Sequence, residues 1–382
     1  MTIKVYLLAG EPSGDLLGSR LMRALKKQTN NDIAFYGIGG ETMQSEGLNS
    51  LFDIKDLSVM GFMEVIPSIP KILRHLNEII ADIKQIQPDV IVTIDSYSFS
   101  IRVHKLLKKN KIDIPHAHYV APQVWAWKKG RAKTLPHFID HLFCLLPDEP
   151  AYFTPYGLPT TFVGHPVIEG GADKGNAQKF RSQYNLDENT PVLAMLPGSR
   201  KNEIKTLLPL FMATAEKLTE THPNLFVVVP TVQTVADKIQ EKMKDWKIPH
   251  AVIFGEENRY DAFAVATIAI AASGTVSLEL AMAHVPHLIA YRLNALTAAL
   301  ARRVLKIKYV NLINLLQDKP VIPELLQENC TVEKLVVTAE TLFQNPYQDV
   351  DPSLEKLGFN SSGLPSERVA TCLLKLAKKG EK

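Results

Sequence analysis

Short apolar runs that alternate with helical segments are the feature that most constrains how this chain folds. The first half carries six such runs, at residues 3–8, 33–38, 90–94, 116–120, 141–145 and 161–163. Helical spacing of apolar residues separates several of them, at 15–27, 69–85 and 98–109. Uninterrupted apolar runs are typical of strands that helices cover on both faces of a parallel sheet. The pattern therefore predicts an α/β fold with a doubly wound sheet.

A stretch rich in glycine and polar residues, GHPVIEGGADKG at residues 164–175, interrupts this alternation. The pattern then restarts, with apolar runs at 192–196, 225–229, 251–254, 268–271 and 287–290. We therefore predict a Rossmann-like domain over 1–165, a second one over 175–345, and a closing segment with a helix over 346–382. Two such domains joined by a linker predict a ligand cleft between them.

Composition excludes several classes of protein. The net charge of +3 over 382 residues is too close to neutral to predict nucleic acid as a partner. Three distant cysteines match neither a disulfide framework nor a metal site and suit a reducing cytosol. Glu11 ends the N-terminal apolar run too early for a signal peptide, and the longest uncharged run, 262–278, is short for a membrane span.

The first glycine-bearing turn, AGEPSGD, follows the first predicted strand and opens the first predicted helix. A helix start of this kind favours an anion. However, the glycines fit neither of the common phosphate-binding motifs. Glu11 and Asp15 would also repel a phosphate, so the turn is expected to hold something other than a nucleotide.

Two turns in the second domain fit a nucleotide better. In LPGSR, Gly198, Ser199 and Arg200 stand between a strand and a helix, where Arg200 offers a planar fork to phosphate. The alternative is a plain helix cap by Ser199 or Asn202 and a solvated arginine.

In ASGTVSLE, a strand ends before Ser273, Gly274 and Thr275, and Glu279 follows one turn into a helix. Its carboxylate suits the two ribose hydroxyls, or it is a dipole partner of the helix start. Taken together, the two turns favour a clamp for a diphosphate and a ribose.

Asp95 directly follows the apolar run at 90–94, at the carboxyl edge of the first predicted sheet. A carboxylate there suits a general base. The alternative is an N-cap of the helix that follows, a common role of aspartate.

Two aromatic or apolar segments are further candidates. In HYVAPQVWAW, Gln123, Trp125 and Trp127 suit a sugar or lipid pocket, and the alternative is that one tryptophan belongs to the core and the lysines that follow are solvated. The segment VMGFMEVIPSIPKIL suits either core packing or a surface that meets a membrane or an acyl chain. The candidate contacts in that segment are Met60, Phe62, Met63, Ile66, Ile69, Ile72 and Leu73.

Taken in order, AGEPSGD, VMGFMEV, IDS, HYVAPQVWAW, GHP, LPGSR, ASGTVSLE, YVNLINLL and PELLQE resemble the lipid-A-disaccharide synthases, over residues 5 to about 330. That family consists of inverting glycosyltransferases with the two-domain GT-B architecture. The resemblance implies that UDP-2,3-diacylglucosamine and 2,3-diacylglucosamine 1-phosphate (lipid X) give the β-1′,6 disaccharide of lipid A and UDP. It also implies a peripheral protein at the inner face of the cytoplasmic membrane, with no metal ion and no other cofactor.

The resemblance also implies roles for single residues. Asp95 matches the base that acts on the acceptor 6-hydroxyl, and Arg200, Glu279 and Asn314 match residues that bind the UDP part. The first turn is then expected to shape the acceptor site, through Glu11, Ser13, Gly14 and Asp15. Where the family often has a second acidic residue, this chain has Ser98, so what orients Asp95 stays open.

Two alternatives share these features. Another GT-B enzyme that uses a UDP-sugar, such as an epimerase, would have the same two-domain plan and nucleotide turns. A non-catalytic carrier of lipid or nucleotide would use the same pockets and would not need Asp95.

Overall fold

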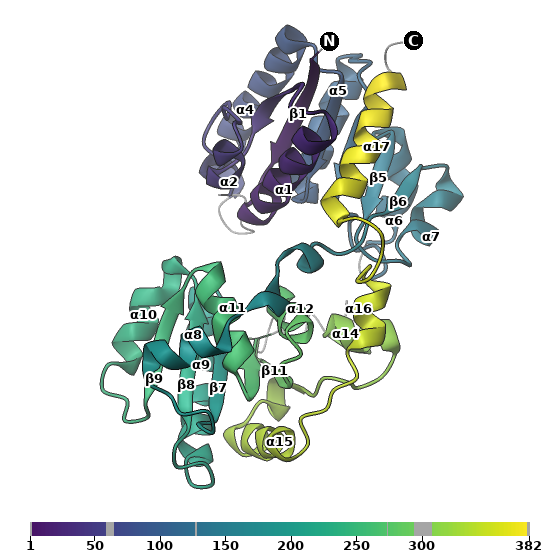
Figure 1. The fold of residues 1–382 in the computed structure, drawn as a ribbon. Helices are drawn as coiled ribbons and strands as arrows, with labels where there is room; N and C mark the ends of the chain where they lie inside the picture. Colours follow the sequence, from purple (N-terminus) through teal and green to yellow (C-terminus); the bar gives the residue numbers. More distant parts are fainter. Residues whose placement is uncertain (1, 59–64, 127, 273, 294–307, 380–382) are drawn as a thin grey trace. The chain divides into compact units, whose positions relative to one another are not determined.

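The computed structural model describes residues 2–58, 65–126, 128–272, 274–293 and 308–379. The chain divides into two compact units. Unit 1 consists of Met1–Pro166 together with Asn360–Lys382, and unit 2 of Val167–Phe359. Each is a parallel sheet covered by helices (Figure 1), which confirms the predicted α/β class with two Rossmann-like domains.

Unit 1 contains a six-stranded sheet in the order β2-β1-β3-β4-β5-β6, with every neighbouring pair parallel. Its strands are β1 (Ile3–Ala9), β2 (Ile33–Ile38), β3 (Val90–Ile94), β4 (His116–Tyr119), β5 (His141–Cys144) and β6 (Thr160–Phe162). Its helices are α1 (Pro12–Gln28), α2 (Glu41–Ser45), α3 (Lys55–Ser58), α4 (Val65–Ile86), α5 (Tyr97–Lys109), α6 (Gly130–Thr134), α7 (Pro150–Phe153) and α17 (Pro365–Lys379).

Strand β1 shows why its residues form a buried strand. Val5 and Leu7 pack into one core layer with α1 and α17. Tyr6 and Leu8 point to the other face and pack with α4 and α5. Because successive side chains of a strand alternate between faces, a strand between two helical layers must be apolar throughout.

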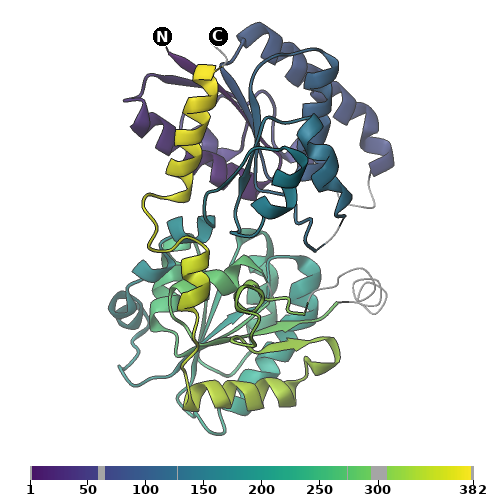
Figure 2. The same cartoon turned by 90° about the vertical axis from the view of Figure 1, so that its right-hand side faces the viewer.

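The C-terminal helix α17 belongs to unit 1, although the whole of unit 2 precedes it in the sequence. Figure 2 shows it alongside the N-terminal part of the chain, and it packs against α1. Arg368 Nη1 also donates to the carbonyl of Val163, at 2.8 Å. The predicted closing segment 346–382 is therefore divided, since α16 (Asp351–Lys356) belongs to unit 2 and α17 to unit 1.

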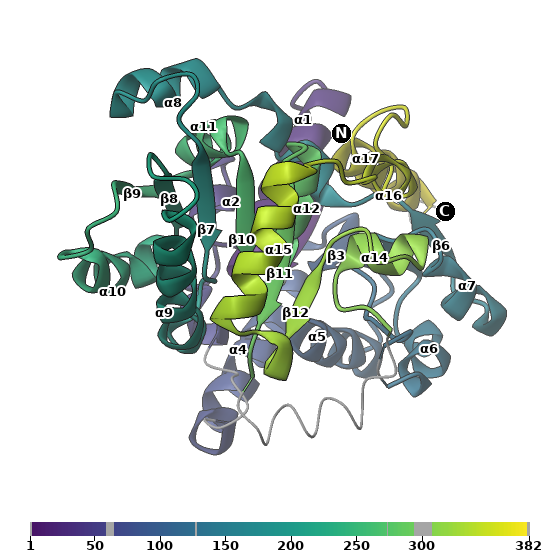
Figure 3. The same cartoon turned by 90° about the horizontal axis from the view of Figure 1, so that it is seen from below.

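Unit 2 contains a second parallel sheet of six strands in the order β12-β11-β10-β7-β8-β9 (Figure 3). Its strands are β7 (Val192–Leu196), β8 (Phe226–Thr231), β9 (His250–Phe254), β10 (Ile268–Ala271), β11 (His287–Tyr291) and β12 (Glu324–Leu326). Besides α16, its helices include α8 (Ala177–Tyr184), α9 (Lys201–Leu218), α10 (Gln233–Met243), α11 (Glu256–Val265), α12 (Thr275–Met282), α14 (Leu312–Gln317) and α15 (Val332–Gln344).

The main core of unit 2 lies between this sheet and the layer formed by α9, α10 and α15. The carboxyl ends of β7, β8 and β10 meet at one edge of the sheet, because neighbouring strands are parallel. Across the ranges that the structure describes, no helix combines the length and the apolar character needed to cross a membrane.

Candidate functional site

Asp95 follows β3 directly, and both oxygens of its carboxylate are held in place. Ser13 Oγ donates to Oδ2 at 2.7 Å, and the backbone N–H of Ser96 donates to Oδ1 at 2.8 Å. The N-cap position of α5 is occupied by Ser96 and not by Asp95. The capping alternative for Asp95 is therefore wrong, and the half-buried carboxylate stands at the carboxyl edge of the sheet with a fixed orientation.

The backbone around Asp95 is strained. Asp95 and Ser96 both have left-handed φ angles, of 55° and 41°, and the β-branched Val120 after β4 has a φ of 86°. Such conformations cost on the order of 1–2 kcal/mol for each residue and persist where the surrounding structure imposes them. Strain on two adjacent strand ends marks this edge as a candidate functional site.

Below this edge lies a chain of buried hydrogen bonds. Thr93 Oγ1 lies 2.8 Å from both His104 Nε2 and His118 Nδ1, and His104 Nδ1 lies 2.9 Å from His116 Nδ1. Burial lowers the pKa of His118 to about 4 and that of His104 well below its ordinary value. These neutral rings join β3, β4 and α5 and fix the strand end that carries Asp95. In the described part of the chain, no cluster of three or more histidine, cysteine or acidic side chains could hold a metal ion.

Asp15 differs from its expected place in an acceptor site. Its side chain is only 6% exposed, and its carboxylate accepts from the backbone N–H groups of Gly40, Thr42 and Met43 and from the Thr42 hydroxyl. These four bonds use the carboxylate fully and anchor the start of α2. Asp15 is therefore a structural residue, which corrects the expectation that it receives acceptor hydroxyls.

The other residues of the first turn are divided between packing and the surface. Gly14 is buried, and a Cβ there would lie 3.0 Å from the carbonyl oxygen of Ile94, so its small size lets α1 approach β3. Glu11 and Ser13 are exposed. In the PQVW segment, Gln123 is exposed and Trp125 is half-buried. Trp127 lies outside the described residues. Glu11, Ser13, Gln123 and Trp125 therefore stay candidates for the acceptor or sugar site, and Gly14 is explained by packing.

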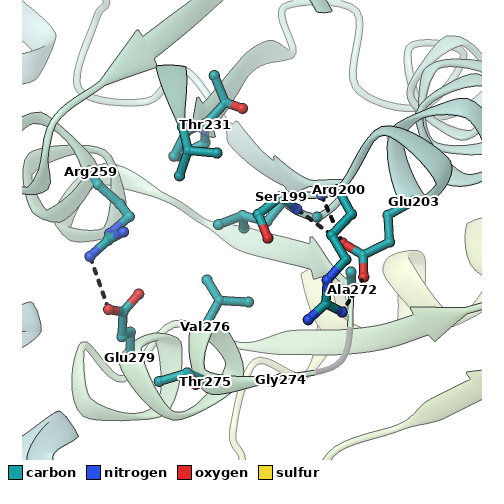
Figure 4. A pocket seen from close by; sticks show the side chains of 14 residues that line it. Ser199, Arg200, Glu203, Thr231, Arg259, Ala272, Gly274, Thr275, Val276 and Glu279 are labelled. Atoms are coloured by element: carbon teal, nitrogen blue, oxygen red, sulfur yellow. Dashed lines mark hydrogen bonds and ion pairs between the residues drawn. The ribbon is translucent and has the colours of Figure 1, made fainter. Parts of the chain in front are cut away.

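A cavity of about 380 Å³ lies at the carboxyl edge of the unit 2 sheet. Six of its lining residues were predicted from the two nucleotide turns: Gly198, Ser199, Arg200, Gly274, Thr275 and Glu279. Figure 4 shows Ser199 and Arg200 on one side of it and Glu279 on the other. Ser273, which was predicted with them, lies outside the described residues.

The turn at Gly198 is closed by Glu203. Its Oε2 accepts from the backbone N–H groups of Ser199 and Arg200, at 3.0 and 3.2 Å, and its Oε1 lies 3.2 Å from Arg200 Nη1. Gly198 has a φ of 105°, and a Cβ there would collide with the same carboxylate. The N-cap position of α9 is therefore Arg200, with Glu203 closing the turn from the third helical position, and not Ser199 or Asn202 as the sequence suggested.

Arg259 is a cavity residue that the sequence reasoning missed. It belongs to α11, lines the cavity, and its Nη2 lies 2.9 Å from Glu279 Oε1. Glu279 is therefore partnered by a guanidinium and is more than a dipole partner of its own helix. In the sequence, Arg259 is a single cationic residue ahead of the apolar residues of α11. A lone arginine in such a position does not by itself predict a binding site.

Asn314 lies apart from this cavity. It is fully buried, donates to the carbonyl of Ile322 and to Glu324 Oε1, and accepts from the backbone N–H of Ile322. These bonds fix the loop that leads from α14 to β12. In this structure the amide of Asn314 has a structural role, and its expected contact with UDP stays a prediction.

The apolar segment divides in a similar way. Met60, Phe62 and Met63 lie outside the described residues, as do the side chains of Ile66 and Ile69. Ile72 is 7% exposed and packs in the core of unit 1, so its predicted contact with lipid is wrong. Leu73, the next residue, is 55% exposed and remains a candidate.

Comparison with known proteins finds similarity to one protein family over nearly the whole chain. The model of a family described as lipid-A-disaccharide synthetase matches residues 5–366. A lipid-A-disaccharide synthase of Rhodospirillum centenum is 44% identical over 380 residues, 98% of this chain and 95% of the relative. One of Paramagnetospirillum magneticum is 46% identical over 385 residues, 99% of this chain and 98% of the relative.

Solved structures agree on the fold. A putative UDP-N-acetylglucosamine 2-epimerase from Listeria monocytogenes has a TM-score of 0.66 at 12% identity and covers 99% of this chain and 98% of its own. The UDP-GlcNAc 2-epimerase from Neisseria meningitidis, bound to UDP-GlcNAc, has a TM-score of 0.61 at 12% identity, with 99% and 100% covered. At this identity the likeness shows the fold alone, which is the GT-B architecture.

Proposed function

The chain belongs to the lipid-A-disaccharide synthase family and is a glycosyltransferase of lipid A biosynthesis, and we propose how its residues divide the reaction. The donor is UDP-2,3-diacylglucosamine, the acceptor is 2,3-diacylglucosamine 1-phosphate (lipid X), and the products are the β-1′,6 disaccharide and UDP. Unit 1 supplies the base, and the cavity of unit 2 holds the nucleotide.

In the proposed step, the Asp95 carboxylate takes the proton of the acceptor 6-hydroxyl. The acceptor oxygen then attacks C1 of the donor sugar from the face opposite the diphosphate. The bond from C1 to the diphosphate oxygen breaks, and UDP leaves with its electron pair, so the configuration at C1 inverts. The leaving group is already good, so deprotonation and stabilisation of the diphosphate charge are the two tasks of the protein.

The observation that carries this assignment is the geometry of Asp95. A carboxylate fixed through both oxygens, on strained backbone at a sheet edge, is what a positioned base needs. This chain has Ser98 where the family often has a second acidic residue, and we propose that Ser13 orients Asp95 in its place, through the hydrogen bond from its hydroxyl.

The nucleotide part of the proposal rests on the cavity of unit 2. Arg200 is 80% exposed at the cavity and is the cation best placed for the diphosphate, and Glu279 is the acceptor for the ribose hydroxyls. A guanidinium and backbone dipoles stabilise phosphate charge without proton transfer. We therefore expect turnover to persist in EDTA.

Peripheral binding to the inner face of the cytoplasmic membrane is part of the same proposal. Leu73 is an exposed apolar side chain on α4, next to Arg74, whose side chain is 65% exposed. An apolar residue flanked by a cation suits a lipid surface. Flotation with anionic and with neutral vesicles tests this part, and recovery of all the protein away from anionic vesicles would contradict it.

The test of the reaction uses purified protein, UDP-2,3-diacylglucosamine and lipid X in detergent micelles with EDTA. UDP and disaccharide are measured together for the wild type and Asp95→Asn. We expect disaccharide from the wild type and about 10²–10⁴-fold less from the variant, with its UDP affinity retained. UDP release without disaccharide would indicate a hydrolase or another acceptor. Disaccharide formation by Asp95→Asn at the wild-type rate would show that another group acts as the base.

A further inference from the structure

The ion pair between Arg259 and Glu279 is a part of the nucleotide cavity that no sequence motif assigns. The two residues come from different helices, α11 and α12, and both line the cavity. Figure 4 shows their side chains pointing toward one another across from Arg200 and Glu203. The side chain of Glu279 is 15% exposed and that of Arg259 is 27% exposed, so water screens this pair less than an ordinary surface pair.

Arg259 is itself held by its neighbours on α11. Its guanidinium lies over the ring of Tyr260, with 5.2 Å to the centroid, and its Nη2 lies 3.6 Å from Glu256 Oε1. The Tyr260 hydroxyl donates to the same Glu256 oxygen, at 2.8 Å. The guanidinium is therefore fixed from the side of its own helix before it reaches Glu279.

Arg259 also has hydrogen-bonding capacity beyond this pair. In the part of the chain that the structure describes, its Nε has no acceptor, and neither has the buried Oγ1 of Thr231 in the same cavity wall. Buried polar atoms without partners are few in native proteins, and each asks for an explanation. Two such atoms in one cavity wall point to a polar ligand.

We infer that Arg259 is a positioning residue for nucleotide recognition. It holds the Glu279 carboxylate in the orientation in which the carboxylate accepts from the 2′- and 3′-hydroxyls of the ribose. The site thereby discriminates ribonucleotides from deoxyribonucleotides. This inference rests on the proposed function, since it needs the unit 2 cavity to be the UDP site.

The chemistry of the pair decides which variants are informative. Lysine keeps the charge but not the planar fork, so it contacts Glu279 without fixing its plane. Methionine keeps much of the stem and its packing on Tyr260 but leaves a carboxylate with little exposure and no counter-charge. A hydrogen bond to a charged group contributes about 1.5–3 kcal/mol, which is about 10–100-fold in affinity.

The experiment measures by calorimetry the Kd of UDP and of 2′-deoxy-UDP for the wild type, Arg259→Met, Arg259→Lys and Glu279→Gln. We expect the wild type to prefer UDP about 10-fold or more, and Arg259→Met to bind UDP about 10–100-fold more weakly, with the preference reduced to about 3-fold or less. Arg259→Lys should retain an intermediate preference.

Lys179→Met is the matched control. It breaks the ion pair with Asp261, on the same helix α11 but outside the cavity lining, and should leave both Kd values unchanged. Thermal melts check the fold of each variant, and Arg259→Lys carries the test if Arg259→Met is unstable.

The outcomes separate this inference from the proposed function. A wild type that makes disaccharide yet binds both nucleotides equally overturns the inference alone, and so does an unchanged preference in both Arg259 variants. A wild type with neither UDP affinity nor turnover overturns the proposed function together with it.

Discussion

The first strand-to-helix turns of the two units follow the same plan but hold different partners. In unit 1, β1 leads through Gly10 into α1, and Ser13 at the start of that helix donates to Asp95 of the neighbouring strand end. In unit 2, β7 leads through Gly198 into α9, and the backbone N–H groups of the turn are bound by Glu203 of the same helix.

This difference shows that the hydrogen-bonding groups of a turn do not by themselves determine the partner that the turn binds. The acidic turn of unit 1 directs a hydroxyl to a carboxylate in a distant part of the chain. The turn of unit 2, whose motif favours a phosphate, already binds a carboxylate of its own. A sequence motif predicts which polar groups lie at a helix start, and the tertiary structure determines which of these groups are available to a ligand.

The largest effect should come from the structural carboxylate of the first turn. Asp15→Asn replaces one carboxylate oxygen by an NH2 group, which then faces backbone N–H donors at the start of α2. We expect a loss of about 2–4 kcal/mol in the free energy of unfolding. Glu11→Gln, at an exposed position of the same turn, is the control and should change the unfolding free energy by less than about 0.5 kcal/mol. Normal stability of Asp15→Asn with a raised KM for the acceptor would restore Asp15 to the acceptor site.

The second largest effect should be a difference between the two units in the stability that each loses as the pH falls. Burial lowers the pKa of His104, His116, His118 and His165 in unit 1, and the described residues of unit 2 add His287. Below the ordinary pKa of 6.5 the unfolded chain binds more protons at these sites, so stability is lost as the pH falls from about 6.5 to 4. For His118 this is up to about 3 kcal/mol. Glu149, whose pKa burial raises to about 7, opposes the effect in unit 1.

We therefore expect unit 1 to open at a higher pH than unit 2. Hydrogen exchange followed by mass spectrometry at pH 7, 6, 5 and 4, corrected for the intrinsic exchange rate, resolves the two units in the intact protein. Earlier loss of protection in unit 2 would show that the histidines do not set the acid limit.

A smaller effect is expected from the hydroxyl that orients the base. Ser13→Ala removes one hydrogen bond to Asp95, worth about 1 kcal/mol, and should lower kcat about 5–10-fold with the Kd of UDP unchanged. Ser13→Thr should restore most of the rate. Ser98→Ala changes an exposed hydroxyl near the same helix start and is the control. A loss of rate in Ser98→Ala alone would assign the orienting role to Ser98.

The smallest effect concerns Glu203. Glu203→Gln keeps an oxygen that accepts from the turn but removes a negative charge beside the expected diphosphate, so UDP should bind about 2–5-fold more tightly at low salt. Glu241→Gln, an exposed change on α10, is the control. Weaker binding of UDP by Glu203→Gln would mean that the ionised carboxylate shapes the turn for the nucleotide.

Much of the fold could be predicted from the sequence, because buried parallel strands are apolar throughout. The runs at 90–94, 192–196 and 268–271 coincide with β3, β7 and β10. The short strand β12 and the helix α11 were missed, since the first has three half-buried residues and the second has its polar residues in its first half. The same logic placed Asp95 directly after β3 and Gly198 directly beyond the end of β7, as the structure has them.

Their partners could not be predicted. Asp15, Asp95 and Glu279 are all acidic residues near a strand-to-helix turn. Their partners are 25–28 residues away for Asp15, 82 for the Ser13 bond of Asp95 and 20 for the Arg259 bond of Glu279. Such contacts exist only after the chain has folded, so local spacing does not show which carboxylate is committed to the protein and which faces a ligand.

The placement of α17 has a consequence for the order of assembly during synthesis. Residues 167–359 form unit 2 as one continuous piece, which can complete its core while the chain is still being made. The first 166 residues emerge earlier, yet the layer that α17 completes over α1 must wait for the last segment of the chain. Until then the core cluster that contains Leu21 and Leu25 of α1 lacks Val369 and Leu373 of α17, and that face of α1 stays uncovered.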